Sequence, residues 1–286
     1  MIYDSVRPDG SAKDMITSED EIIIGDSWKI SGEIKVKEGY LKAVTVSPSG
    51  YIYLGGDSFI SCYDKDIELI WDIKSPAPVT SLSFYGDSLF ATTLDMVLVI
   101  SNKGKIINEW GPFENNSIIT SVSANRSFVA FADAGSKTVF ILDKGGEVKK
   151  MIGRNDGQFI VPSPYFDVVL NNDNTFFVAN TGHRRVETRT IDGEIVSYFG
   201  EPGTGPDSFC GCCNPAHFVV IPDGFITAEK GINRIKILNT KGEFVEYVSS
   251  VNSFIASVPL DLASTDGKTI YAANPDDSKL YIFKRK

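Results

Sequence analysis

Short runs of β-branched and aromatic residues, separated by polar turns, recur along nearly the whole chain. The clearest set of four covers residues 168–170, 175–178, 185–190 and 195–199. Runs of this length and composition, bounded by turn residues, are typical of antiparallel β-strands. No stretch sustains the apolar spacing of an amphipathic helix. The pattern therefore predicts an all-β chain.

Two turn signals repeat at a nearly constant interval. A Gly-based hairpin turn precedes a charged and then apolar run at four places, namely Gly104, Gly146, Gly193 and Gly242. A second tract follows a β-rich run and aligns without gaps at four places, beginning at Ala132, Ala179, Ala228 and Ala273. The copies lie 42–49 residues apart, and four short strands per repeat of that length indicate a β-propeller blade.

The repeat predicts six blades between residues 27 and 286. Their innermost strands are expected to begin near Leu41, Val79, Ile119, Phe166, Phe218 and Leu260. The last unit contains only three strand-like runs, whereas an additional run, residues 28–36, precedes the first blade. We expect this N-terminal strand to complete the sixth blade, which closes the ring and removes an open sheet edge. The prediction is a single six-bladed β-propeller of four-stranded antiparallel blades.

The repeats resemble NHL repeats, a family of six-bladed propellers. The likeness is sharpest over residues 152–240, where Gly-rich segments at 153–164 and 200–215 are similar to the interblade loop of the family. The tract from Ala179 to Val186 is similar to the Asn-x-Arg-Val signature of these repeats. The resemblance covers roughly nine-tenths of the chain and implies the fold. It implies little about activity, because such propellers serve as enzymes, RNA readers and protein-binding platforms.

Charge narrows the range of partners. The formal net charge is -9, from 28 basic and 37 acidic residues. Residues 1–26 hold seven acidic and two basic residues, so we expect an acidic N-terminal arm before the propeller. A modestly acidic body lacks the clustered Lys and Arg that phosphate backbones require, so no nucleic-acid partner is expected. We expect a monomer whose partner is a protein or a small molecule.

The sequence shows no sign of membrane insertion or secretion. No apolar run approaches the ~18 residues of a membrane helix. The first residues lack the basic and apolar regions of a signal peptide, although a removed one would leave no trace. The four cysteines are too few for a disulfide scaffold.

The most unusual tract runs from Phe209 to His217 and contains Cys210, Cys212 and Cys213. Strands alternate in direction, so this loop, which enters blade five, should share a face with the turn containing His183 in blade four. Aligning Pro164 with Pro215 places His217 at the position of Phe166, near the mouth of the central channel. Loops on a rigid scaffold commonly carry function, so this face is the expected binding face.

Three interpretations of the cysteine tract remain open. Thiolates with imidazole suit zinc, copper(I) or iron–sulfur, so His183, His217 and Cys212 could hold a metal ion, with zinc as the candidate cofactor. Calcium is the other candidate cofactor, but it takes oxygen ligands and would need Asp, Glu and Asn side chains in the channel. A disulfide could link Cys210 to Cys213, or Cys212 to Cys213, with a structural or redox role. The third interpretation is three reduced thiols that pack as small apolar groups.

The turn in blade four supplies the other candidate ligand residues, Asn180, His183, Arg184 and Arg185. An anion could bind the two arginines, although we favour an arginine that packs along the blade and pairs with Glu187 or Glu194. Asn180 is expected to cap its turn.

No recognised catalytic motif is present. Lyases that resemble these propellers use three histidines around zinc, whereas this chain has only two. We therefore favour a binding scaffold that holds its ligand on the loop face around the channel. The alternatives are a metal-assisted lyase or hydrolase with a His/Cys site on that face, and a redox module that uses the loop from Cys210 to Cys213.

Overall fold

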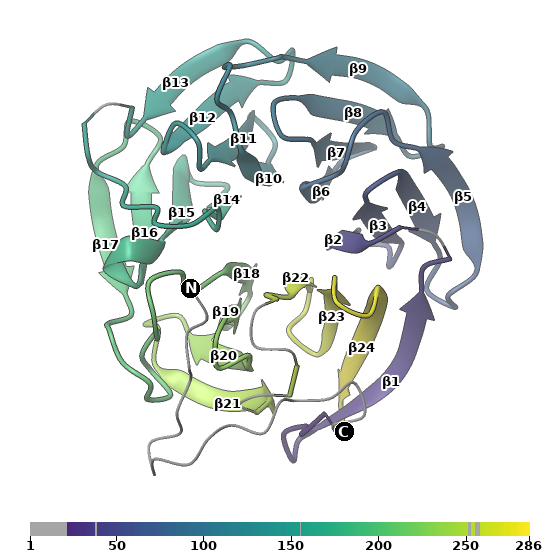
Figure 1. Cartoon of the computed structure of the whole chain (residues 1–286), viewed down its shortest axis with the longest axis vertical. Coiled ribbons are helices and arrows are strands. Elements are labelled where there is room, and N and C mark those ends of the chain that lie inside the picture. The colour runs from purple at the N-terminus through teal and green to yellow at the C-terminus, as the bar shows by residue number, and fades with distance from the viewer. Residues whose placement is uncertain (1–21, 38, 155, 251–252, 255–257) are drawn as a thin grey trace, which may run out of the picture.

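The computed structural model describes residues 22–37, 39–154, 156–250, 253–254 and 258–286. Within these residues the strands form six four-stranded antiparallel sheets, arranged as blades around a central axis (Figure 1). The only helical element of the described part is a single 3-10 turn, η1 (Thr181–His183). The predicted all-β six-bladed propeller is confirmed.

Each blade follows the chain from its innermost to its outermost strand. Blades one and two comprise β2 (Leu41–Val46), β3 (Ile52–Gly56), β4 (Phe59–Tyr63), β5 (Leu69–Lys74), β6 (Ser81–Tyr85), β7 (Ser88–Thr92), β8 (Val97–Ser101) and β9 (Ile106–Trp110). Blades three and four comprise β10 (Ile119–Ala124), β11 (Phe128–Asp133), β12 (Thr138–Asp143), β13 (Val148–Ile152), β14 (Val168–Leu170), β15 (Thr175–Asn180), β16 (Arg185–Thr190) and β17 (Ile195–Phe199). Blades five and six comprise β18 (His217–Ile221), β19 (Gly224–Ala228), β20 (Ile235–Asn239), β21 (Phe244–Ser249), β22 (Asp261–Ala263), β23 (Thr269–Asn274), β24 (Lys279–Arg285) and β1 (Trp28–Lys35). The observed innermost strands begin within two residues of the expected positions.

The N-terminal strand closes the ring as predicted. β1 pairs with β24 in antiparallel register, with Trp28 opposite Arg285 and Lys35 opposite Lys279. Blade six thus combines the first strand in the sequence, β1, with the last three, β22, β23 and β24 (Figure 1). Residues 1–21 of the expected acidic arm lie outside the described residues. Its last residues run along β21, where the Gly25 amide donates to the Val248 carbonyl at 2.9 Å.

The core lies between the blades rather than in the central channel. Each of six clusters of buried apolar side chains joins two neighbouring blades. The repeated hairpin glycines explain part of this packing, because Gly104 has φ +76° and a Cβ there would lie 2.7 Å from the Trp71 ring. The Trp71 and Trp110 side chains therefore pack between blades at the outer rim.

Alternating strand direction divides the connections between two faces. The loops that enter each innermost strand, and those that join the second strand to the third, emerge on one face, which we call the loop face. The cysteine tract and η1 both lie on it. The Arg184 Nε donates to the Gly211 carbonyl at 2.6 Å, so the turn of blade four contacts the loop that enters blade five. The expectation that these two segments share a face is confirmed.

Candidate functional site

Six equivalent positions encircle the channel mouth, one on or beside each innermost strand. The strand register identifies them as Ala43, Ser81, Ser121, Asp167, His217 and Asp261. Residues from all six innermost strands line the axial cavity below, which has a volume of about 160 Å³. Three consecutive blades contribute Asp167, His217 and Asp261, so one half of the mouth is polar and titratable. We call these three residues the channel triad.

The same ring of positions ties the blades together. Ser81 Oγ accepts the Val122 amide of the next blade at 3.2 Å, and Ser121 Oγ accepts the Val168 amide at 3.1 Å. Asp167 and Asp261 are therefore also structural acceptors, since carboxylates occupy the position at which blades two and three use serine.

Asp167 uses both carboxylate oxygens. Oδ2 accepts the Phe218 amide of blade five at 2.9 Å, and Oδ1 accepts the Val168 amide at 3.0 Å and the Ser121 hydroxyl. Its Oδ2 also lies 3.8 Å from His217 Nδ1. Asp167 is thus bonded to three consecutive blades, which fixes its position beside the imidazole.

Asp261 has more free capacity than Asp167. Its Oδ2 accepts the Val44 amide of blade one at 2.8 Å. Its Oδ1 lies 3.5 Å from His217 Nδ1, which is long for a hydrogen bond. Both carboxylates therefore face the same imidazole nitrogen, Nδ1, and Asp261 Oδ1 can accept from a ligand at the mouth.

Burial shapes the electrostatics of the channel triad. Burial raises the pKa of Asp167 above its ordinary value, although the neighbouring His217 and the hydrogen bonds that it accepts oppose the shift. Burial also raises the pKa of Asp261 to about 6. An ionised buried carboxylate costs folding free energy, so these side chains are retained at the expense of stability. Carboxyl groups with raised pKa values in a concave site are typical of functional sites.

The rim beside His217 carries a lysine and a tyrosine. The Tyr165 ring meets the His217 ring edge-on, with 6.5 Å between their centroids. The Lys230 ammonium lies 4.9 Å from the centroid of the same tyrosine ring. The mouth thus has a basic and aromatic rim above an acidic interior.

The cysteine tract borders this rim. All four cysteines are free thiols. The Sγ atoms of Cys212 and Cys213 are 3.3 Å apart, and Ser163 Oγ donates to Cys213 Sγ at 2.8 Å. Cys210 faces the Lys230 carbonyl instead, at 3.8 Å. Cys62 is buried in the core between blades one and two.

The turn of blade four that contains Arg184 and Arg185, which we call the arginine turn, makes mostly internal contacts. Arg185 pairs with Glu187 at 2.6 Å and lies 4.4 Å above the Tyr198 ring, so the favoured internal ion pair is present. Asn180 is fully buried, and its amide donates to Gln158 O and to Glu187 Oε1. The expectation that Asn180 caps its turn was wrong, because its side chain makes no cap hydrogen bond to η1. These internal hydrogen bonds occupy the side chain instead.

The expected metal ligands do not form a group. Within the described ranges, no three His, Cys, Asp or Glu side chains are arranged to hold a metal ion. His183 is exposed on η1, whereas His217 is half-buried at the channel. A zinc ion held by His183, His217 and Cys212 thus remains a prediction to which this geometry gives no support.

Sequence reasoning found His217 but missed its two partners. The strand register places His217 opposite Ala228 in blade five. Asp167 has the same position beside Ala179 in blade four. His217 therefore corresponds to Asp167, and its predicted alignment with Phe166 was wrong by one residue. Asp167 and Asp261 each directly follow a predicted blade start. An alignment of the blades at the repeated alanine would have matched Asp167 with Asp261, because each lies twelve residues before it. His217 lies eleven residues before Ala228, so the same alignment would have left it one position away.

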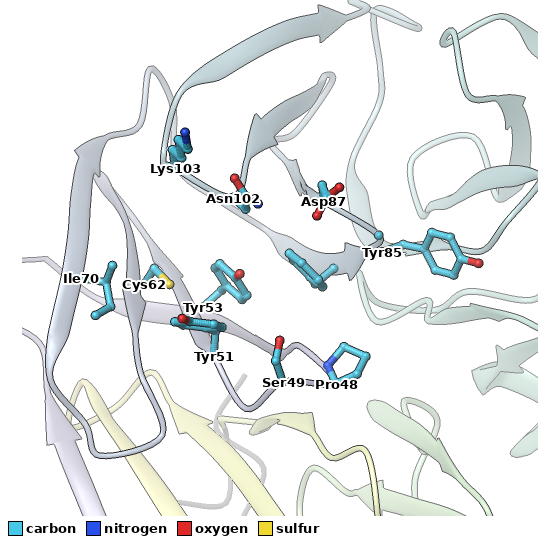
Figure 2. Close-up of a pocket in the computed structure, with 12 residues that line it drawn as sticks. Pro48, Ser49, Tyr51, Tyr53, Cys62, Ile70, Tyr85, Asp87, Asn102 and Lys103 are labelled. Atoms are coloured by element: carbon cyan, nitrogen blue, oxygen red, sulfur yellow. The ribbon is translucent and has the colours of Figure 1, made fainter.

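A separate cleft of about 680 Å³ opens between blades one and two. The rings of Tyr51 and Tyr53 border it from blade one, and Asp87 and Lys103 border it from blade two (Figure 2). Tyr53 stacks on Phe84 with 5.0 Å between the ring centroids. The lining loops join first to second and third to fourth strands, so this cleft lies on the face opposite the channel triad.

Comparison with known proteins supports the fold. No family model matches the chain, and no curated protein sequence matches it. A streptogramin B lyase structure aligns with a TM-score of 0.64 and 12% identity, covering 91% of this chain and 98% of the lyase. The WD40 β-propeller domain of Doa1 aligns with a TM-score of 0.62 and 14% identity, covering 88% and 81%. Virginiamycin B lyase from Staphylococcus aureus aligns with a TM-score of 0.61 and 17% identity, covering 91% and 100%.

Identities this low establish the propeller fold alone. The NHL-repeat resemblance remains a prediction, since none of these matches identifies that family. In the described part of the chain, no helix is long and apolar enough to span a bilayer.

Proposed function

We propose that this propeller is a binding scaffold that holds a small cationic ligand at the channel mouth. The observation that supports it most is the channel triad, in which two buried carboxylates with raised pKa values flank one imidazole. A positive charge beside Asp261 would offset the cost of its burial, because an opposite charge favours the ionised form of a carboxyl group.

The size and composition of the cavity agree with this ligand class. A volume of about 160 Å³ suits a small group rather than a drug-sized molecule. Asp261 Oδ1 supplies an acceptor, while the serine hydroxyls of blades two and three line the same space.

A paired-ligand experiment tests the proposal. n-Butylammonium and n-butanol have the same chain, but only the first carries a charge. We expect n-butylammonium to raise the Tm of the full chain with a saturable concentration dependence and n-butanol to leave it unchanged. The Asp261→Asn variant should lose the response to the amine. Equal responses to both compounds, or an undiminished response in the variant, would contradict the proposal.

A second candidate is an enzyme that uses His217 in acid–base catalysis. Two carboxylates lie near Nδ1, an arrangement that can orient an imidazole whose other nitrogen faces a substrate. Two of the structurally similar proteins are lyases, one of them a streptogramin B lyase. Turnover of a streptogramin B compound that disappears in His217→Ala would support this function. If no product forms and the amine binds, the result would contradict the enzyme and support the binding scaffold.

A further inference from the structure

Two adjacent thiols are held in contact at the tip of the loop that enters blade five. The Sγ atoms of Cys212 and Cys213 are 3.3 Å apart. Cys212 is exposed and Cys213 is half-buried, so a small reagent can reach the pair. Cys210 is turned away, because its Sγ faces the Lys230 carbonyl and lies 3.4 Å from Asn214 Nδ2. The geometry therefore selects Cys212 and Cys213 from the pairs that the sequence leaves open.

The loop around the two thiols is anchored on both sides. The Asn214 amide donates to the carbonyls of Cys210 and Lys230, at 2.8 and 2.7 Å, and its Oδ1 accepts the Lys230 amide at 2.7 Å. The Arg184 side chain holds the Gly211 carbonyl at 2.6 Å. Cys212 and Cys213 thus lie between two hydrogen-bonded residues, Gly211 and Asn214, and the folded loop holds their sulfur atoms in contact.

Bond geometry predicts that a disulfide here would be labile. Adjacent Cα atoms are about 3.8 Å apart across a trans peptide. Unstrained disulfides need Cα separations of about 4.4–6.8 Å, so a bond between neighbouring residues is strained and easily reduced. Strained or exposed disulfides have the more oxidising potentials typical of regulatory bonds, rather than those of structural ones.

We propose that Cys212 and Cys213 form a reversible vicinal disulfide by exchange with a small-molecule disulfide such as oxidised glutathione. The thiolate of one cysteine attacks glutathione disulfide, forms a mixed disulfide and releases one glutathione thiolate. The second cysteine thiolate attacks the protein sulfur of that mixed disulfide and releases the second glutathione. The protein loses two electrons and two protons, and the glutathione disulfide is reduced to two thiols.

The exchange changes the rim of the channel mouth. In the reduced state, Ser163 donates to Cys213 Sγ and thereby links the loop of blade five to the loop that leads into blade four. Closing the sulfur pair from 3.3 Å to about 2.05 Å draws Cys213 toward Cys212. Oxidation would therefore weaken this link between the two loops while leaving the strands of both blades paired.

Quantitative alkylation of the full chain tests the proposal. The reduced protein is equilibrated in glutathione buffers of increasing oxidised fraction, quenched in acid, alkylated and analysed by peptide mass spectrometry. We expect Cys212 and Cys213 to lose alkylation together, in one peptide lighter by two hydrogen atoms than its reduced, unalkylated form. Dithiothreitol should restore both thiols, and buried Cys62 should stay reduced throughout.

Three variants make the assignment specific. Cys210→Ser should retain the light peptide, whereas Cys212→Ser and Cys213→Ser should lack it and accumulate the glutathione mixed disulfide. Thermal unfolding of each variant should match the parent protein, since the loop lies outside the strand ladders. Loss of the light peptide in Cys210→Ser, or its absence from the parent protein in every buffer, would overturn the proposal.

Discussion

The Asp261→Asn variant should be more stable than the parent protein at neutral pH. Burial raises the pKa of Asp261 from 3.8 to about 6. Each unit of pKa shift corresponds to 1.36 kcal/mol, so the ionised side chain costs about 3 kcal/mol of folding free energy above pH 6. Asparagine removes this cost and keeps an oxygen that can accept the Val44 amide. Its amide has a desolvation cost of its own, so we expect a net gain of about 1–2 kcal/mol.

The protonation of Asp261 determines how the stability difference between Asp261→Asn and the parent protein changes with pH. Between pH 3.8 and pH 6 the folded state binds more protons at Asp261 than the unfolded state does. The contribution of Asp261 to the free energy of unfolding of the parent protein therefore falls as pH rises through this window. The advantage of Asp261→Asn should be largest above pH 6 and should vanish near pH 4. In a domain of this size, a gain of 1–2 kcal/mol corresponds to a rise of about 2–8 °C in Tm.

Urea denaturation at pH 4, 5, 6 and 7.5 measures this difference, with linear extrapolation to water. Asp223→Asn is the matched control, because Asp223 is an exposed acid in the turn between β18 and β19. Its effect should stay within about 0.5 kcal/mol at every pH. A destabilised Asp261→Asn at pH 7.5, or a difference between variant and parent that does not change with pH, would refute the account of burial.

Three further perturbations test the packing and the buried charges. Burial lowers the pKa of Lys236 to about 8, so the stability of the parent protein relative to Lys236→Met should rise between pH 8 and pH 10.5, as measured by urea denaturation. Gly104→Ala should cost more stability than Gly86→Ala, by about 1–3 kcal/mol in chemical denaturation, because both glycines have positive φ but only a Cβ at Gly104 would meet Trp71. Glu187→Leu should cost about 3–5 kcal/mol, because it leaves two arginines without their carboxylate, and a Tm unchanged from the parent protein would contradict that role.

The fold was predictable because every blade repeats the same local signals. Strand-length apolar runs, hairpin glycines such as Gly104 and the tract that begins at Ala179 each recur at one interval, and the missing last strand had a single candidate in residues 28–36. These signals are local in sequence, so one chain suffices to detect them.

The channel triad was only partly predictable, because it depends on register across three blades. The sequence marks His217 because the chain has only two histidines and because this one follows the cysteine tract. Asp167 and Asp261 each follow an apolar residue at a strand start, and only the arrangement of the blades brings both near Nδ1 of the imidazole. A shift of one residue in the alignment of blades four and five was enough to conceal this arrangement.

The arginine turn shows the reverse case. The sequence makes Arg184 and Arg185 candidates for binding an anion, with an internal ion pair as the favoured alternative. The structure shows Arg185 paired with buried Glu187, and Arg184 bonded to the Gly211 carbonyl. The sequence could identify Glu187 as a partner because alternate residues of one strand point to the same side.

The central claim is that the channel triad binds a cationic group. A titration with n-butylammonium, monitored through the NMR signals of the histidine side chains, tests it most directly. The chain has two histidines, so His183, exposed on η1, serves as an internal control for His217. The account predicts that n-butylammonium shifts the imidazole signals of His217 with saturation while those of His183 stay in place, and that n-butanol shifts neither. Signals of His217 that do not respond to the amine, or that move in parallel with those of His183, would contradict it.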